Sequence, residues 1–215
     1  MAHTRDGQRR VILDLGCGER KVAGATGTDI RPLLGVDVVH DLARVPYPFA
    51  TSSADEIHLN HVLEHMPDAI KVLEEVWRIS KPGGTVHIRV PHYTGPYAWI
   101  DPTHVRCFTS ASFSYFGSNI YSYYTHARFR VAAIRLRYFW DPSFRRIYNW
   151  WGAVVQWVLD RHPTFFERFL AYLVGGIDEV QVTLVTVKSD YAPAGSERED
   201  AGARRTAEAT AASRG

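Results

Sequence analysis

The chain has 215 residues, a hydrophobic share of 46% and a formal net charge of +2. This length suits one domain with a full core, and the near-neutral charge argues against a nucleic-acid partner. Two cysteines leave no disulfide framework and suit a reducing compartment. Because the N-terminus is polar and lacks the apolar segment of a signal peptide, the sequence predicts a cytoplasmic protein.

The predicted elements begin with an apolar strand at residues 11–15, which ends in the turn Gly16-Cys17-Gly18. Such a strand suits the buried position of a parallel sheet, and glycine lets a ligand approach the backbone closely. Asp14 places acceptor oxygens beside that turn. The dinucleotide fingerprint is incomplete, because Lys21 stands where its third glycine belongs. The spacing alone therefore leaves two interpretations open, a nucleotide-like ligand or a tight strand-to-helix turn.

The next stretch alternates short strands with helical or turn segments. Expected in order are one or two helical turns within 19–27, strands at 27–30, 36–39 and 54–59, a helix after Pro67-Asp68, and a strand at 85–90. This alternation predicts an α/β domain with a parallel sheet.

The second half begins with a long irregular stretch at residues 92–119, and long loops inside a domain are usually functional. A strand at 129–139, a very apolar helical segment at 147–176 and a final strand at 179–188 follow. Residues 189–215 lack periodicity, which predicts a disordered tail.

Five motifs follow one another along the chain: the Leu13–Gly18 turn, Asp29 ending the second strand, Asp41-Leu42, Val62-Leu63-Glu64-His65, and Lys81-Pro82-Gly83-Gly84. In this order they resemble the motifs of class I S-adenosylmethionine-dependent methyltransferases. The resemblance covers residues 10–93 and continues more loosely through 101–106. It implies a doubly wound, mostly parallel, seven-stranded Rossmann-like sheet with an antiparallel last strand. One methyltransferase domain would span 1–188, with an aromatic helical insertion at about 140–177.

The resemblance also implies where S-adenosylmethionine lies. The glycine turn would approach its methionine part, and a carboxylate at position 29 would accept hydrogens from the ribose hydroxyls. Asp41 would pair with the adenine amino group and Leu42 would flank the ring. The end of the fourth strand would lie by the methyl group. The implied cofactor-binding residues are Asp14, Gly16, Cys17, Gly18, Asp29, Ile30, Asp41, Leu42, Asn60 and His61.

Candidates for the chemistry lie after the fifth strand. His104 follows Asp101 by three residues, so one helical turn would let the carboxylate hold the imidazole in one tautomer for general base catalysis. His92 is the other candidate base, while Tyr93 and Arg106 are candidates for substrate binding. The alternative is that these side chains only staple the loop. The spacing does not fit a metal motif, so no metal is expected.

We expect methyl transfer to a small-molecule acceptor, with a hydroxyl favoured by the candidate base. The alternative is a membrane-peripheral methyltransferase or a non-catalytic module acting on a lipid-linked or glycan substrate. The aromatic segment would then rest on a membrane through Trp150, Trp151 and Trp157, instead of acting as a lid or core cover. A homodimer contact is a further possibility for the same segment.

Overall fold

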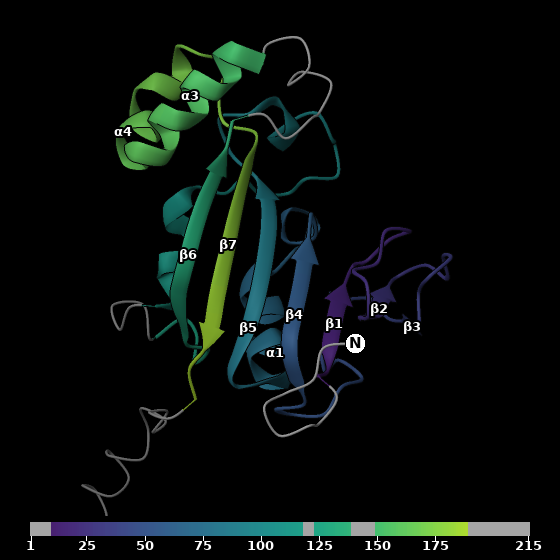
Figure 1. Ribbon diagram of the computed structural model, residues 1–215. Coiled ribbons are helices and arrows are strands. Elements are labelled where there is room, and N and C mark those ends of the chain that lie inside the picture. The colour runs from purple at the N-terminus through teal and green to yellow at the C-terminus, as the bar shows by residue number, and fades with distance from the viewer. Residues whose placement is uncertain (1–9, 118–122, 139–148, 189–215) are drawn as a thin grey trace, which may run out of the picture.

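A seven-stranded sheet in the order β3-β2-β1-β4-β5-β7-β6 forms the centre of the computed structural model, which describes residues 10–117, 123–138 and 149–188 (Figure 1). The strands are β1 Ile12–Leu15, β2 Thr26–Asp29, β3 Val38–Val39, β4 Ala54–Asn60, β5 Ser80–Pro91, β6 Phe129–Arg137 and β7 Glu179–Thr186. β7 runs antiparallel to β5 and to β6, and the remaining pairs are parallel. The predicted Rossmann-like sheet with an antiparallel last strand is confirmed.

The predicted helix after Pro67-Asp68 is α1, Ala69–Ile79. The Asp68 carboxylate accepts hydrogen bonds from the backbone N–H groups of Ile70 and Lys71, both at 3.1 Å, which satisfies free donors of the first turn. The other helices are η1 Leu63–His65, η2 Pro96–Ala98, η3 Ser110–Phe116, α3 Asn149–Arg161, α4 Pro163–Arg168 and η5 Leu170–Tyr172.

The two faces of the sheet differ in character. One face is apolar and buried, and α1 packs behind it in Figure 1. The other face carries polar, partly exposed side chains such as His58, His87 and Gln181. No helix of the described residues covers this second face, so the helical layer that contains α1 has no counterpart there.

The crossover between β1 and β2 explains part of this difference. Residues 16–25 form turns only, so the expectation of one or two helical turns within 19–27 was wrong. The backbone N–H groups of Gly16 and Cys17 both donate to the Thr28 carbonyl, at 2.7 and 3.0 Å. The first of these bonds continues the parallel ladder between β1 and β2 past Leu15. Residues 16–25 alone join the two strands, and this short connection contains Gly16, Gly18 and Gly24.

The apolar segment before β7 is broken into three helices. The break falls at His162-Pro163, because proline lacks the N–H that would continue α3. None of the helices described here is both long and apolar enough to span a membrane. The predicted disordered tail, 189–215, and the start of the aromatic segment, 139–148, lie outside the described residues.

Candidate functional site

The glycine turn after β1 has two residues with positive φ, Gly16 at +74° and Gly18 at +51°. A Cβ atom on Gly16 would lie 2.4 Å from Cγ2 of Val62, so glycine is required there for packing as well as for conformation. A Cβ on Gly18 would meet no atom within 4 Å. The backbone at Gly18 therefore borders open space, as a ligand approaching the turn requires.

Two buried oxygens near this turn lack hydrogen-bond partners within the described part of the chain. They are Oδ1 of Asp14 and Oγ1 of Thr28. Oδ2 of Asp14 accepts from the backbone N–H of Val22 at 2.7 Å. Burial raises the pKa of the Asp14 carboxyl, although this hydrogen bond lowers it. A buried acceptor without a donor is costly, so a ligand that carries N–H or O–H groups fits this end of β1.

The carboxylate of Asp29 is held by the backbone on both sides. Oδ2 accepts from the N–H of Gly18 at 2.9 Å, and Oδ1 accepts from the N–H of Arg31 at 3.1 Å. Each oxygen retains a second lone pair, and the side chain is partly exposed. It is therefore oriented to accept hydrogens from a diol. Ile30, beside it, is 61% exposed.

The expected adenine contacts lie after β3. Oδ1 of Asp41 accepts from the N–H of Ala43 at 2.9 Å. Leu42 is buried in the core, and its carbonyl accepts the Tyr47 hydroxyl hydrogen at 2.9 Å. These contacts fix the backbone of the segment and leave the carboxylate of Asp41 partly exposed.

At the end of β4, Asn60 is followed by His61, a non-glycine residue with φ +55°. The ring nitrogens of His61 lie 3.2 Å from Oε1 of Glu64 and 2.9 Å from Oε1 of Glu179. Burial lowers the pKa of His61, but hydrogen bonds to Glu179 and Glu64 outweigh it and raise the pKa to about 9. At neutral pH, His61 is therefore a cation between two carboxylates.

A cavity of about 230 Å³ opens at the carboxyl ends of β4 and β5. Its lining residues are His61, Glu64, His65, Pro91, Tyr97, Ile100, Asp101, His104, Asp178 and Glu179. It adjoins the glycine turn, since Val62, which packs against Gly16, directly follows His61. The fold thus brings three predicted site residues, His61, Asp101 and His104, to one cavity.

The expected hydrogen bond between Asp101 and His104 is not formed. Nδ1 of His104 donates to the Ala98 carbonyl at 3.2 Å, and Oδ2 of Asp101 lies 4.0 Å from Nε2. Oδ1 of Asp101 instead accepts from the N–H and hydroxyl of Thr103, at 2.8 and 2.7 Å. The Ala98 carbonyl therefore sets the tautomer, and Nε2 of His104 keeps its lone pair.

His92 lies apart from this cavity and is fully buried. Nδ1 accepts from the N–H of Thr94 at 3.3 Å, so the hydrogen is on Nε2, which donates to Oε1 of Glu167 at 2.9 Å. The N–H and Oγ1 of Ser110 donate to the same carboxylate. Nε2 of His92 thus joins the end of β5 to α4, and Nδ1 is engaged by Thr94.

The two candidate substrate residues are also absent from the cavity lining. The hydroxyl of Tyr93 is 2.9 Å from that of Tyr172, and this hydrogen bond, followed by burial, raises the pKa of Tyr93 to about 12. Nε and Nη2 of Arg106 donate to the carbonyls of Met66 and Pro67, at 3.1 and 2.6 Å. These contacts favour the stapling role that the sequence left open for Arg106.

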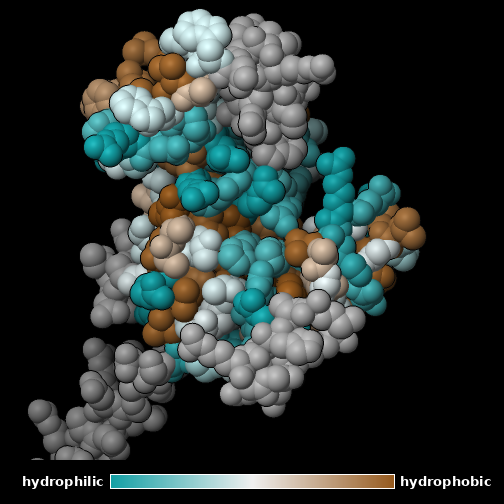
Figure 2. Space-filling view, viewed as in Figure 1, coloured by the Kyte–Doolittle hydropathy of each residue, from teal (hydrophilic) through white to brown (hydrophobic). Residues whose placement is uncertain are grey.

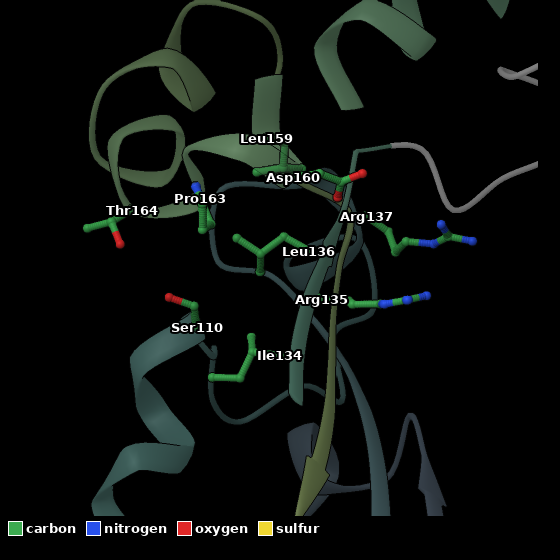
Figure 3. A pocket seen from close by; sticks show the side chains of 9 residues that line it. All are labelled: Ser110, Ile134, Arg135, Leu136, Arg137, Leu159, Asp160, Pro163 and Thr164. Carbon is green, nitrogen blue, oxygen red and sulfur yellow. The ribbon is translucent and has the colours of Figure 1, made fainter. Parts of the chain in front are cut away.

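A larger cavity, about 630 Å³, lies between β6 and the α3–α4 junction (Figure 3). Ile134 and Leu136 point towards Ser110, while Arg135 and Arg137 point to the other side of β6. β6 is the edge strand at the opposite end of the sheet from β3, β2 and β1, so this cavity lies far along the sheet from the glycine turn after β1. We therefore place the candidate acceptor site in the smaller cavity.

Sequence reasoning assigned no catalytic or binding role to Glu64, His65 or Glu179, which all line the smaller cavity, and expected His65 only to pack at the edge of the fourth strand. Glu64 and His65 stand in the Val62–His65 motif, so the sequence did contain a signal that could have identified them as site residues. Glu179 is the first residue of β7, and nothing in its local sequence indicates that it meets His61 across the sheet.

Comparisons with known proteins agree with the fold. A family model described as a methyltransferase domain matches residues 2–168. An S-adenosylmethionine-dependent methyltransferase from Archaeoglobus fulgidus has a TM-score of 0.52 and 16% identity, covering 82% of this chain and 86% of that one. A complex of the Haloferax volcanii Trm112 methyltransferase activator with a putative methyltransferase has a TM-score of 0.53 and 17% identity, and the match covers 85% of this chain and 84% of that one. A putative methyltransferase from Bacillus halodurans has a TM-score of 0.53 and 12% identity, covering 84% of this chain and 94% of that one. No curated protein matches the chain.

Proposed function

The chain belongs to the S-adenosylmethionine-dependent methyltransferase family, and on that premise we propose that it methylates a hydroxyl oxygen of a small-molecule acceptor. The cofactor supplies an electrophilic methyl group on a positively charged sulfur. The reaction forms an O–CH₃ bond and breaks the S–CH₃ bond. The hydroxyl proton passes to solvent and S-adenosylhomocysteine leaves.

The residues around the glycine turn fit this cofactor. The free acceptor Oδ1 of Asp14 suits a ligand that carries N–H donors, and Gly18 leaves space for one. Asp29, oriented by two backbone N–H groups, would accept hydrogens from the ribose hydroxyls. Asp41 and Leu42 would face the adenine, and Asn60 and His61 the methionine end. These assignments rest on position and on the contacts described above.

The observation that carries the acceptor assignment is the 230 Å³ cavity beside the turn. It is small for a ligand site, since such pockets usually measure about 300–1,000 Å³, which favours a small acceptor group. Its lining contains four carboxylate residues and no lysine or arginine. An anionic acceptor is therefore disfavoured. Nε2 of His104 faces this cavity with a lone pair, and we assign that atom to activation of the hydroxyl, with Asp101 beside it.

The test is a panel of hydroxylated and amino acceptors incubated with the protein and S-adenosylmethionine, with S-adenosylhomocysteine as the readout. His104→Ala should lower turnover by a factor of about 10²–10⁴, the usual contribution of a group acting on the reacting proton. Affinity for S-adenosylhomocysteine should stay unchanged. His162→Ala, at an exposed histidine outside the cavity lining, is the matched control. Methylation of nitrogen only, or full turnover of the His104 variant, would refute the assignment.

A second candidate is a membrane-peripheral methyltransferase acting on a lipid-linked acceptor. It is favoured by the exposed apolar and aromatic surface of α3, α4 and η5; brown and near-white residues gather there at the top of Figure 2. The exposed members are Trp150, Trp151, Val154, Trp157, Phe165, Phe169, Tyr172 and Leu173. Trp150, Val154 and Trp157 follow helical spacing, so they form one stripe. Arg161 and Arg168, both exposed, end the two helices and suit an anionic bilayer.

Sedimentation with phosphatidylglycerol-containing vesicles tests this second candidate. Binding that is lost in Trp150→Ser/Trp157→Ser supports a bilayer contact. A concentration-dependent dimer without vesicle binding would assign the surface to a second copy of the chain instead.

The remaining assignments are that residues 1–188 act as one methyltransferase domain and that the protein is cytoplasmic. The latter is supported by two free cysteines, Cys17 and Cys107.

A further inference from the structure

We propose that Glu64, His65 and His104 bind a divalent metal ion of the zinc type at the wall of the acceptor cavity. One ligand atom from each of the three residues lies within 4.8 Å of the other two. The inference rests on the proposed function, because it states how His104 would act on the hydroxyl, namely through an ion that it helps to hold.

Two segments distant in sequence build this group. Glu64 and His65 belong to η1, directly after β4, while His104 comes from the loop after η2. The N–H of Val105 donates to the Glu64 carbonyl at 2.9 Å and joins the two segments. The rings of His65 and His104 lie 4.6 Å apart at 71°. The backbone therefore holds the two imidazoles close together.

The hydrogen-bond directions fix the tautomer of each imidazole. The Thr103 hydroxyl donates to Oδ1 of Asp101 at 2.7 Å. Its oxygen must then accept the hydrogen of Nδ1 of His65, which lies 2.9 Å away. Nδ1 of His104 donates to the Ala98 carbonyl at 3.2 Å, because a carbonyl only accepts. Both rings consequently carry hydrogen on Nδ1 and a lone pair on Nε2. Histidines that bind metals commonly show this pattern, in which the other nitrogen donates to an oxygen.

Glu64 would supply the negatively charged ligand of the ion. It is 1% exposed, and Oε1 lies 3.2 Å from Nδ1 of His61. Oε2 is buried and has no hydrogen-bond partner among the described residues. A buried acceptor left unsatisfied costs about 1–3 kcal/mol, more when charged. A cation at this position would satisfy Oε2, while the two Nε2 lone pairs complete its ligands.

The donor set selects the class of ion. Two imidazoles and one carboxylate are typical of catalytic zinc sites, which keep a further position open for water or substrate. Magnesium prefers oxygen ligands and is disfavoured here. Oδ2 of Asp101, 4.0 Å from Nε2 of His104, lies close enough to become a fourth ligand or to accept from a coordinated water. An ion here would draw electron density from the acceptor hydroxyl, so that its proton leaves more readily to water.

The chain offers an internal comparison in a second group, Glu56, His58 and His87, on the open sheet face. There Oε1 of Glu56 already bonds Nε2 of His58 at 2.8 Å and also contacts Nε2 of His87 at 3.6 Å. The Glu56 carboxylate and the His58 imidazole already satisfy each other's hydrogen-bonding groups. This group is therefore the matched control.

The experiment titrates untagged, chelator-treated protein with Zn²⁺ and with Co²⁺, whose visible absorption reports the ligand geometry. One ion per chain is expected. Glu64→Gln and His65→Ala should abolish this stoichiometric binding, and Thr103→Val should weaken it by about 10- to 100-fold, as loss of an orienting partner does. His58→Ala should leave it unchanged. Circular dichroism checks that each variant is folded.

The outcomes separate the inference from the proposed function. Absence of binding at micromolar ion, or binding that depends on His58 and not on Glu64, overturns the metal site. Hydroxyl methylation that persists undiminished in chelator-treated protein overturns the ion's part in activating the hydroxyl and leaves the proposed function intact. Stoichiometric binding through Glu64 and His65 supports the site, even if the acceptor panel then yields no methylated hydroxyl and the proposed function fails alone.

Discussion

Replacing His92 with phenylalanine distinguishes a structural histidine from a catalytic base. Nε2 of His92 donates to the buried carboxylate of Glu167 at 2.9 Å, and Nδ1 accepts from Thr94. Phenylalanine fills a similar space but offers no donor. Glu167 would keep only its two hydrogen bonds from Ser110. The variant should therefore lose stability, because a buried carboxylate loses one of its three donors.

The magnitude follows from the contact that is lost. A hydrogen bond to a charged group contributes about 1.5–3 kcal/mol. For a chain of this size, each kcal/mol shifts the melting temperature by about 2–4 °C. His92→Phe should thus melt about 3–12 °C lower than the wild type. His92→Gln is the matched control, since its amide N–H can replace Nε2–H as a donor to Glu167, and it should melt closer to the wild type.

Thermal unfolding by circular dichroism and turnover are measured on both variants. If His92 joins β5 to α4, the glutamine variant keeps most of its turnover, because glutamine preserves the donor. If His92 is instead the base, the glutamine variant is folded, as stable as the wild type and inactive. That second result would refute the structural assignment and return the catalytic role to His92.

Three further predictions concern the cofactor turn and the α4 anchor. Asp29→Ala should weaken S-adenosylhomocysteine binding by about 10- to 100-fold in calorimetry, the equivalent of one or two hydrogen bonds to a charged group, and unchanged affinity would remove it from the ribose role. Gly16→Ala should destabilise the protein by about 1–3 kcal/mol in urea unfolding, because φ is +74° and the new Cβ would meet Val62. Adding Val62→Ala should restore only the part due to the clash. Burial raises the pKa of Glu167, but hydrogen bonds from His92 and Ser110 outweigh it and hold the pKa below its ordinary 4.5. Its stabilising contribution is therefore present above pH 4.5 and is lost as pH falls through the lower, folded-state value; Glu167→Gln should flatten this acid limb of the stability curve.

The sequence predicts the sheet well because the buried strands are marked by apolar runs and the turns by glycine and proline. The boundaries of α1 follow from Asp68, whose capping role is local. The crossover after β1 was harder, since residues 19–27 are short and interrupted by glycine, and one or two helical turns were still expected there. One contact that holds the observed turns is the hydrogen bond from the N–H of Val22 to Oδ2 of Asp14, at 2.7 Å. Such bonds join positions that periodicity cannot relate.

The candidate site likewise contains residues that the sequence identifies and residues whose roles only the fold reveals. Residues beside the glycine turn could be named from sequence because they follow strand ends at fixed spacing. His92 and His104 look alike in sequence, each a histidine in the loop region after β5. Only the fold separates them, because Glu167 comes from a helix 75 positions away, whereas His104 meets the end of β4. Partners that far apart leave no trace in local sequence.

The antiparallel strand β7 links the acceptor cavity to the core of the sheet. Its first residue, Glu179, is fully buried and faces Arg89 of β5, with Nε 3.1 Å from Oε1, and His61 after β4. His61 adopts a left-handed conformation, which costs a non-glycine residue about 1–2 kcal/mol, and its hydrogen bonds to Glu179 and Glu64 offset that cost. The same contacts hold Glu64 with Oε2 unpartnered at the cavity wall. The reversal of β7 therefore has a consequence for chemistry, because it brings the Glu179 carboxylate to the edge where β4 and β5 end. There Glu179 bonds His61, and His61 in turn bonds Oε1 of Glu64, a ligand of the proposed ion.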